Sequence, residues 1–385
     1  MAFASGALDG VRVIDLTRVL GGPYCTQILG DHGADIIKVE SEHGDETRAW
    51  GPPFHEGTAA YFLGVNRNKR SIVLDLAGSS GRDALLDLLS EADVLVENFK
   101  TGTLEKWGLG HDAVLAKRFP RLVHCRITGY GDDGPLGGVP GYDAAVQAIA
   151  GLMSVNGERS GGPLRVGIPL VDIATGMNAA LGILLALFER DRSGRGQLVE
   201  TTLFDTAVAI LHPHLVNYFF SGETPRRTGN AHPNITPYDV FATATTPIFL
   251  AVGNDRQFAA LCRVLGRPVL SADPRFPSNA LRTRNRDDLK TELEALMQGR
   301  SCEGLVAELT DQGVPCSPVG DVASLAAHPH TRHRGMIAEI DGVRAPAPPI
   351  KLSRTPASVR RPPPNLGEHD REILAPPANS DRGLE

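Results

Sequence analysis

Short apolar runs alternate with helical patterns through the first 130 residues of the chain. Five runs dominated by Val and Ile predict buried strands, at residues 11–16, 35–40, 71–76, 93–99 and 121–128. Amphipathic stretches near residues 24–32, 82–91 and 111–118 predict the helices between them. This alternation is typical of an α/β fold with a mostly parallel sheet, whose ligands bind beyond the carboxyl ends of the strands.

The pattern after residue 196 indicates a second, smaller unit. Residues 196–220 predict a strand that passes into one helix, and the polar residues 221–237 predict a linker or an active-site loop. An α+β pattern follows. Its strands are expected at 238–242 and 248–252, and its helices near 255–265, 287–298 and 302–312.

The last 50 residues are rich in proline and contain few elements of their own. Their strand candidates, at 336–340 and 350–352, favour a segment that packs back onto another surface over a disordered tail. We therefore expect four parts: a large α/β domain at 1–205, a helix and linker at 206–237, a small α+β domain at 238–330, and a returning C-terminal segment at 331–385.

Residues 141–176 lead into a helix built from small residues, and Asp172 lies where this helix starts. Pro169 keeps the chain extended at Ile168. The small residues allow close approach of a neighbouring backbone, and the apolar length of the helix predicts burial. On local grounds Asp172 is an N-cap favoured by the helix dipole. The same field would also hold an ionised carboxylate suited to covalent catalysis through an acyl anhydride.

Charge and cysteine content describe a soluble protein of a reducing compartment. The net charge of −6 disfavours nucleic acid and anionic membranes as general partners. The five cysteines are scattered without a CxxC spacing, which argues against a disulfide framework. The N-terminus lacks the pattern of a secretory signal, and no window is expected to reach membrane-spanning length. We expect a cytoplasmic location.

Two cofactor classes are disfavoured. The histidine pairs have no Cys or carboxylate at ligand spacing, so we expect no metal site. After the first predicted strand the chain reads Leu20-Gly21-Gly22-Pro23, and not the G-x-G-x-x-G of a dinucleotide-binding fold. A nicotinamide-dependent dehydrogenase is therefore a distant alternative.

A series of motifs in order along the chain resembles the family III CoA-transferases. These motifs are LDGVRVIDLTRVLGGPYCTQILGDHGADIIKVE, GDETRAWGPP, NRNKRSIVLDL, ADVLVENFKTGTLEKWGLG, ITGYGDDGP, GYDAAVQAIAGLM, VDIATG, GRGQLVETTLFD and LGEHD. The family includes formyl-CoA transferase, carnitine CoA-transferases and the α-methylacyl-CoA racemases. The resemblance extends from Leu8 to about Leu374.

This resemblance implies a fold, an oligomer and a mechanism. It implies a Rossmann-like large domain joined to a small domain, with two chains threaded through one another as an interlocked homodimer. The family's nucleophilic aspartate falls on Asp172. It attacks an acyl-CoA thioester to give a mixed anhydride, and CoA thiolate converts this to an aspartyl-CoA thioester. Coenzyme A is then a substrate, and no permanently bound cofactor is needed.

The resemblance also transfers a set of CoA contacts. The matching positions are Leu20, Gly21, Leu74, Asn98, Phe99 and Lys106. Leu20 replaces a glutamine of formyl-CoA transferase, so a side-chain amide contact is lost. Lys106 stands where an arginine often binds phosphate, and it keeps the charge without the bidentate fork. Ser41 replaces another arginine, which weakens the expected grip on phosphate. The alternative for Lys106 is a solvated helix lysine.

Tyr142 separates two activities of the family. The racemases carry a histidine here that moves a proton at the α-carbon. A tyrosine, with a reference pKa near 10, is a poor general base at neutral pH. It can donate a hydrogen bond to an oxyanion, or it can simply pack beside Asp172. A transferase is therefore favoured over a racemase-type isomerase, and the retained Asp172 and Tyr142 argue against a catalytically inactive CoA-binding homologue.

Within the family the motifs most resemble succinate–hydroxymethylglutarate CoA-transferases, which act on dicarboxylic acids such as succinate, glutarate and 3-hydroxy-3-methylglutarate. Trp50 falls on a tryptophan that shapes the acyl pocket of formyl-CoA transferase. Arg48 could pair with a distal carboxylate, or with an acid of its own loop. His232 and Asn234 are candidates for a loop that closes over the acyl group.

Overall fold

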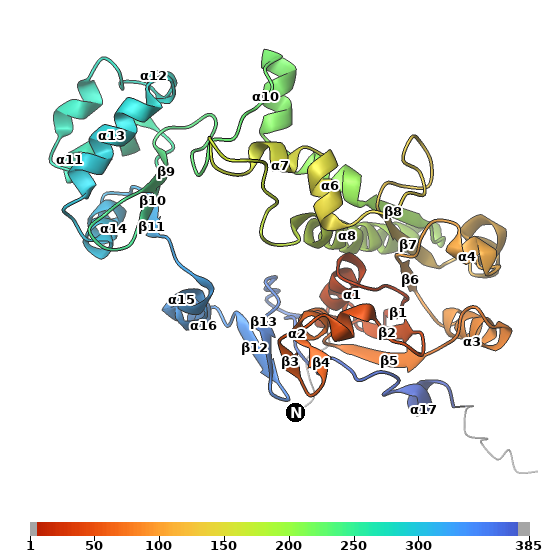
Figure 1. Cartoon of the computed structure of the whole chain (residues 1–385). Helices are drawn as coiled ribbons and strands as arrows, with labels where there is room; N and C mark the ends of the chain where they lie inside the picture. The colour runs from red at the N-terminus through yellow and green to blue at the C-terminus, as the bar shows by residue number, and fades with distance from the viewer. Residues whose placement is uncertain (1–5, 376–385) are drawn as a thin grey trace, which may run out of the picture. The chain divides into compact units, whose positions relative to one another are not determined.

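The computed structural model describes residues 6–375, which form two compact units (Figure 1). Unit 1 contains the described residues of 1–151, 166–212 and 329–385, and unit 2 contains residues 152–165 and 213–328. The chain therefore enters unit 2 twice and returns twice to unit 1. The four domain boundaries expected from the sequence stay a prediction.

A six-stranded parallel sheet forms the centre of unit 1. Its strands are β1 (Arg12–Asp15), β2 (Asp35–Glu40), β5 (Lys69–Val73), β6 (Val94–Glu97), β7 (Val123–Thr128) and β8 (Leu198–Thr202). They lie in the order β5-β2-β1-β6-β7-β8, and every neighbouring pair is parallel. This confirms the predicted α/β class. The strand order reverses between β1 and β6, and such a switch point is where open α/β sheets bind ligands.

Helices cover both faces of this sheet because its side chains alternate between the faces. Ile14 and Leu16 belong to one buried cluster with Leu85 of α3 (Ser79–Leu89). Asp15 points to the other face, where it accepts a hydrogen bond from Thr26 of α1 (Gly21–Asp31). The further helices of unit 1 are α2 (Ala60–Leu63), α4 (Thr103–Lys106), α5 (Ala116–Arg118), α6 (Asp143–Ile149), α8 (Leu170–Ser193) and α9 (Leu203–Ala209). Single turns η1 (Glu46–Ala49) and η2 (His111–Leu115) and the hairpin β3 (Phe54–His55) and β4 (Thr58–Ala59) complete this region.

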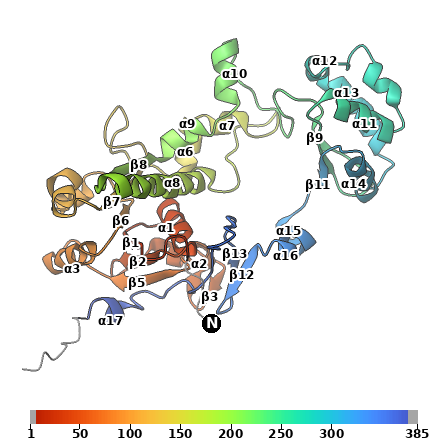
Figure 2. The same ribbon diagram turned by 180° about the vertical axis from the view of Figure 1, so that it is seen from behind.

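The long helix α8 packs beside α1 (Figure 1, Figure 2). Gly176 makes the close approach possible, since a Cβ at this position would lie 2.4 Å from the carbonyl oxygen of Gly21. The expected close backbone contact is thus confirmed. Only one face of α8 is buried, however. Large apolar side chains on the other face are exposed in the single chain: Met177, Leu181, Leu184, Leu185 and Phe188.

Among the described residues, α8 is the one helix that is long and apolar enough to cross a membrane by length and composition alone. The prediction that no stretch reaches this length was therefore wrong. The helix nevertheless packs against α1 and the sheet, and 44% of its apolar window is buried. A core helix of a soluble protein passes the same test.

The C-terminal segment covers the edge strand β5. Ser71 donates its backbone N–H to the His369 ring and accepts one from the His369 backbone, while Val73 N donates to the Asp370 carboxylate. The segment contains α16 (Pro329–His333), the hairpin of β12 (Ile337–Ile340) and β13 (Val343–Pro346), and α17 (Asp370–Ile373). The strand expected at 350–352 was wrong, because the partner of β12 is the adjacent β13.

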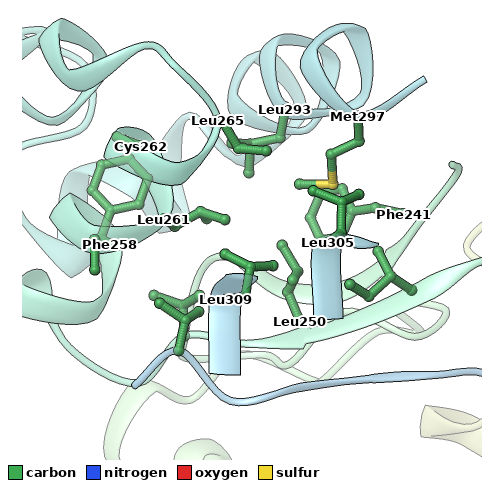
Figure 3. Close-up of a cluster of buried hydrophobic side chains, with 14 of the residues drawn as sticks. Phe241, Leu250, Phe258, Leu261, Cys262, Leu265, Leu293, Met297, Leu305 and Leu309 are labelled. Carbon is green, nitrogen blue, oxygen red and sulfur yellow. The ribbon is translucent and has the colours of Figure 1, made fainter. Parts of the chain in front are cut away.

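Unit 2 is built on the antiparallel sheet β11-β10-β9. Its elements are α7 (Leu152–Val155), α10 (His214–Ser221), β9 (Tyr238–Phe241), β10 (Ile248–Ala251), α11 (Asp255–Val264), η3 (Pro268–Ala272), α12 (Asn279–Arg284), α13 (Arg286–Met297), α14 (Cys302–Asp311), β11 (Cys316–Pro318) and α15 (Val322–Ala327). Side chains of the sheet and of α11, α13 and α14 form its core, including Leu250, Leu261, Leu293 and Leu305 (Figure 3). The single helix expected to reach Phe220 was wrong, since α9 ends at Ala209 and α10 starts after Pro213.

Candidate active site

A cavity of about 210 Å³ opens in unit 1 at the switch point, where the loops after β1 and β6 meet. The end of β7, the loop from β7 to α6 and the starts of α8 and α9 line the rest of its wall, together with Glu46 of η1. Six residues singled out from the sequence line it: Leu20, Gly21, Asn98, Phe99, Tyr142 and Asp172. Residues from four separate segments of the chain are thus brought to one place by the topology of the sheet.

A second cavity, of about 370 Å³, shares three lining residues with the first: Arg18, Phe99 and Lys100. It is lined by Leu74, as expected for a CoA contact, and by Ser41. Phe99 packs edge-on against Trp107, with ring centroids 5.2 Å apart. The two neighbouring hollows together offer room for an extended ligand.

Asp172 is the third residue of α8, and Pro169 occupies the N-cap position. The interpretation of Asp172 as the N-cap was therefore wrong. Asp143, at the start of α6, satisfies these amides in its place: its carboxylate accepts from Val171 N at 2.8 Å and from Asp172 N at 3.2 Å. It also accepts from the Gln147 amide at 2.6 Å. A side chain from another helix thus caps α8.

This cap changes the electrostatics of Asp172. Burial and the negative charge of Asp143 raise the pKa of the Asp172 carboxyl to about 7. The helix field expected to hold Asp172 ionised acts less on its carboxyl group, because the first amides of α8 already face the Asp143 carboxylate. Asp172 therefore lies near its midpoint at neutral pH, which is a usual setting for a group that takes part in chemistry.

The start of a second helix faces Asp172. Gly21 is the first residue of α1, and a Cβ there would lie 3.2 Å from the Asp172 carbonyl oxygen. The N–H groups of Gly21 and Gly22 have no acceptor within their helix, and Pro23 removes the next donor. These two amides and the helix dipole are suited to stabilise negative charge on an oxygen in the cavity.

Aromatic residues lie on the exposed side of this site. Tyr142 is 62% exposed and immediately precedes α6. Tyr61, which the sequence reading missed, has its phenol pKa raised by burial and by the nearby charges of Asp172, Asp143 and Asp45. Its ring contacts Trp50 edge-on at 5.4 Å. Trp50 itself lines neither of the two cavities.

The positively charged side chains that line the two cavities are Arg18 and Lys100, and not the expected Lys106. Lys106 lies exposed on α4 and lines neither cavity, in keeping with the solvated alternative. Arg18 and Lys100 line both, and both are exposed. The Arg18 guanidinium lies 5.9 Å from the centre of the Phe99 ring. The positions of these two residues directly after β1 and β6 were the available signal in the sequence.

Arg48 forms a structural ion pair. Its guanidinium donates to both oxygens of the buried Glu40, at 2.7 and 2.9 Å, and to the backbone oxygen of Pro364. It also lies over the Phe62 ring at 3.8 Å. This pairing lowers the pKa of Glu40 against the effect of burial. Of the two alternatives for Arg48, the acid of its own region is the one observed.

His232 and Asn234 belong to unit 2. The His232 ring lies 5.2 Å from that of Tyr238, and its Nδ1 accepts from Asn234 N. Asn234 Oδ1 accepts from the Asn217 amide. Their proposed role in covering an acyl group stays a prediction. Residues 6–375 contain no group of three His, Cys, Asp or Glu side chains that could hold a metal ion.

Comparisons with known proteins identify the family of the chain. A family model described as CoA-transferase family III matches residues 8–370. Succinate–glutarate CoA-transferase of Agrobacterium fabrum is 41% identical over 96% of this chain and 95% of its own, and succinyl-CoA:glutarate CoA-transferase of Mus musculus is 37% identical over 98% and 87%. The crystal structure of a CAIB/BAIF family protein from Brucella suis superposes with a TM-score of 0.87 at 41% identity, covering 96% of this chain and 99% of that one. The chain is therefore an enzyme that belongs to CoA-transferase family III.

Proposed function

We propose that this enzyme transfers CoA between dicarboxylic acids of the size of succinate and glutarate, with Asp172 as the nucleophile. The observation that carries the proposal is the place of Asp172, in a cavity at the switch point and opposite the uncapped start of α1. The acids are suggested by the names of the two transferases from Agrobacterium fabrum and Mus musculus.

The first step uses the ionised form of Asp172. One carboxylate oxygen attacks the thioester carbon, the carbon–sulfur bond breaks, and CoA leaves as thiolate. Negative charge develops on the thioester oxygen during this attack. The N–H groups of Gly21 and Gly22 supply the stabilisation, because they are preorganised at a helix start and free of intrahelical partners.

The second step returns CoA to the enzyme. The thiolate attacks the Asp172 carbonyl carbon of the mixed anhydride, and the donor acid leaves as carboxylate. The aspartyl-CoA thioester then reacts with the acceptor acid by the same two steps in reverse. Arg18 and Lys100, which line both cavities, are suited to hold the anionic groups of CoA during these exchanges.

We also propose that the enzyme works as an interlocked homodimer in the cytoplasm. The exposed apolar face of α8, with Leu181, Leu185 and Phe188, supports burial against a second copy. The five free cysteines support a reducing compartment. Light scattering of the purified enzyme tests the dimer, and a mass of two chains is expected. A monomeric wild-type enzyme would contradict the proposal.

The chemical proposal is tested by trapping the covalent intermediate. Wild-type enzyme is mixed with succinyl-CoA and hydroxylamine, digested, and examined by mass spectrometry. A hydroxamate is expected on Asp172 and is absent from Asp172→Asn. Glu46→Gln is the matched control, because Glu46 is the other carboxylate lining the cavity and its loss leaves the adduct on Asp172.

Two outcomes would overturn the proposal. An adduct on Glu46 would move the nucleophile to another residue. No adduct with any of several acyl-CoA donors, together with exchange of the substrate α-proton for solvent deuterium, would place the enzyme with the racemase-type isomerases of its family. If the adduct forms on Asp172, the rates of CoA transfer to a series of acceptor acids from acetate to glutarate test the preference for dicarboxylic acids.

A further inference from the structure

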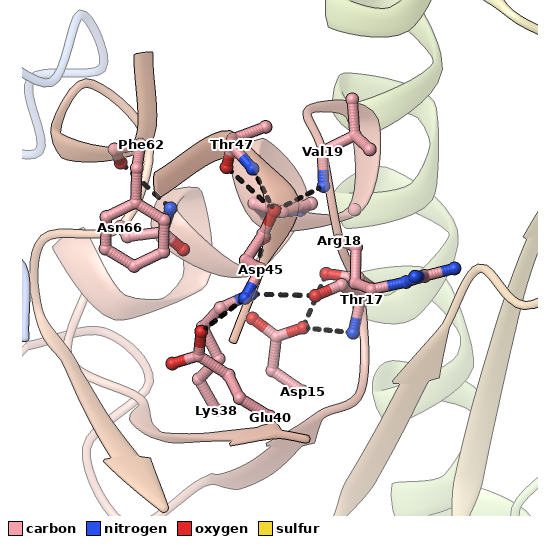
Figure 4. A network of polar contacts seen from close by, with 12 residues as sticks. Asp15, Thr17, Arg18, Val19, Lys38, Glu40, Asp45, Thr47, Phe62 and Asn66 are labelled. Atoms are coloured by element: carbon pink, nitrogen blue, oxygen red, sulfur yellow. Dashed lines mark hydrogen bonds and ion pairs between the residues drawn. The ribbon is translucent and has the colours of Figure 1, made fainter. Parts of the chain in front are cut away.

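A cluster of buried charges lies beneath the loop that joins β1 to α1 (Figure 4). Asp15, Lys38, Asp45 and Lys69 are each at most 1% exposed. The chemistry proposed for Asp172 uses none of them. Charges this deeply buried are costly unless they are paired and fully hydrogen-bonded, and an apolar core of the same volume is often more stable. Their retention calls for a role other than stability.

The pair of Lys38 and Asp45 holds the two ends of a tight bend. Lys38 Nζ donates to the backbone oxygen of Thr17 at 2.7 Å and to Asp45 Oδ2 at 3.1 Å. Asp45 Oδ1 accepts the backbone N–H of Val19 at 3.4 Å, and both the N–H and the hydroxyl of Thr47. The pair therefore links the carbonyl before Arg18 to the amide after it.

Asp15 and Lys69 hold the flanks of the same loop. Asp15 accepts the N–H and the hydroxyl of Thr17, at 2.9 and 2.5 Å. Lys69 Nζ donates to Asp15 Oδ2 at 3.0 Å and to the backbone oxygen of Pro23 at 2.9 Å. Apart from the ion pair itself and a bond from Lys69 to Asn66 Oδ1, the side-chain bonds of Asp15 and Lys69 end on this loop or on α1.

The bend needs such support because of Val19. This residue has φ 70°, a left-handed conformation that a β-branched side chain rarely adopts. Leu20 and Gly21 follow directly and line the cavity, and Gly21 contacts the backbone of Asp172. If Val19 relaxed to a negative φ, the start of α1 would move relative to Asp172.

We propose that Lys38 and Asp45 are positioning residues: they hold Val19 in its left-handed conformation and thereby set the place of the Gly21 and Gly22 amides opposite Asp172. Asp45 lines the second cavity and bonds the backbone of Val19, but neither Lys38 nor Asp45 lines the cavity that holds Asp172. Its effect on acyl transfer rests on the proposed function of Asp172, but its effect on the loop does not.

The test is a double-mutant cycle between Asp45→Asn and Val19→Gly, read as the rate of adduct formation on Asp172 at saturating acyl-CoA. Asp45→Asn is expected to slow this rate about 10- to 100-fold per folded enzyme, because a misplacement of about 1 Å has effects of this size. Glycine adopts φ 70° without strain. When Asp45→Asn is combined with Val19→Gly, the factor by which Asp45→Asn slows the rate is therefore expected to be smaller by about threefold or more.

Asp341→Gly is the matched control for the glycine substitution. Asp341 also has a positive φ, of 48°, but lies in the exposed turn between β12 and β13. The Asp341→Gly substitution is expected to leave the rate of adduct formation unchanged, and the effect of Asp45→Asn on this rate is expected to be the same with or without it. Hydrogen exchange of the peptide spanning residues 17–22 in the free enzyme is the second readout, and Asp45→Asn is expected to raise it about tenfold with little change elsewhere.

The outcomes separate the possibilities. A folded Asp45→Asn enzyme with an unchanged rate, or a loss equally large in the Val19→Gly background, would overturn the proposal and leave the pair a purely structural feature. If Asp45→Asn fails to fold, Thr47→Val removes one of the bonds to Asp45 and provides the same test. If the wild type forms no adduct, the proposed function fails, while the exchange of residues 17–22 still decides the role of the pair.

Discussion

Replacement of Asp143 by asparagine should shift the pH dependence of acylation to lower pH. The Asp143 carboxylate accepts the backbone N–H of Asp172 at 3.2 Å, and its charge is the second cause, after burial, of the raised Asp172 pKa. An asparagine side chain removes this charge but keeps an oxygen that can accept the same amides. The substitution therefore isolates the electrostatic effect from the loss of the cap.

The expected shift in the pKa of Asp172 follows from the usual effect of one carboxylate charge on the pKa of a neighbouring carboxyl group. A like charge a few ångströms away raises a carboxyl pKa by about one unit or more. Burial remains in the variant, so the pKa of Asp172 should fall from about 7 to about 6. At pH 6 the ionised fraction then rises from about one tenth to about one half, which accelerates acylation about fivefold. At pH 8.5 both enzymes are ionised and their rates should agree within about twofold.

The assay is the single-turnover formation of the Asp172 adduct from pH 5.5 to 8.5, with substrate saturating at each pH. Asp143→Ala is the companion variant, because it removes both the charge and the cap. The alanine variant is expected to melt at a lower temperature than Asp143→Asn, because it also loses the side-chain cap, which is worth about 1 kcal/mol. An unchanged profile for Asp143→Asn, or one moved to higher pH, would refute this account of the Asp172 pKa.

Three further predictions concern stability and ligand binding. Asp172→Asn should melt about 3 °C or more above the wild type at pH 8, and at the same temperature as the wild type near pH 4. The reason is that the raised pKa of Asp172 in the native state makes wild-type stability fall as the pH rises between these values. Equal melting temperatures at pH 8 in calorimetry would contradict this prediction. Arg18→Ala and Lys100→Ala should each raise KM for acyl-CoA about tenfold, and Lys106→Ala less than about threefold; a larger effect of Lys106 in steady-state kinetics would restore the sequence-based assignment. Arg48→Ala should lower stability to urea by about 3 kcal/mol at pH 7, because it removes the cation that binds both oxygens of the buried Glu40. The ratio of rates for glutarate and acetate as acceptors should not change; a change in that ratio would place Arg48 at the substrate.

The sheet and the place of the site were predictable because they depend on local patterns. Strands covered on both faces are runs of Val and Ile, and the topology of such a sheet brings the residues after β1 and β6 together. Gly176 was informative for the same reason, since small residues indicate a close backbone neighbour. These features need only the residue types and their order along the chain.

Pairings between distant residues were not predictable in this way. Asp143 caps the helix of an aspartate 29 residues away, and nothing in the GYD sequence specifies that partner. From the sequence, Arg48 could pair equally well with a substrate carboxylate or with an acid of its own loop. It pairs with Glu40 because the end of β2 lies beside this loop. The apolar residues around α8 indicate burial on all sides, whereas the single chain covers only the side that faces α1.

In the proposed mechanism the two helix starts at this site have opposite tasks, and this difference sets the pKa of the proposed nucleophile, Asp172. The amides of α8 are occupied by Asp143, so the carboxylate of Asp172 gains little from its own helix and its pKa rises. The amides at Gly21 and Gly22 begin a different helix, which has no side-chain cap, and in the proposed mechanism they bind the thioester oxygen. If both starts were free, the field would stabilise the resting carboxylate as much as the transition state, and such uniform stabilisation does not accelerate the step. Capping one helix and leaving the other open directs the stabilisation to the charge that develops during the reaction.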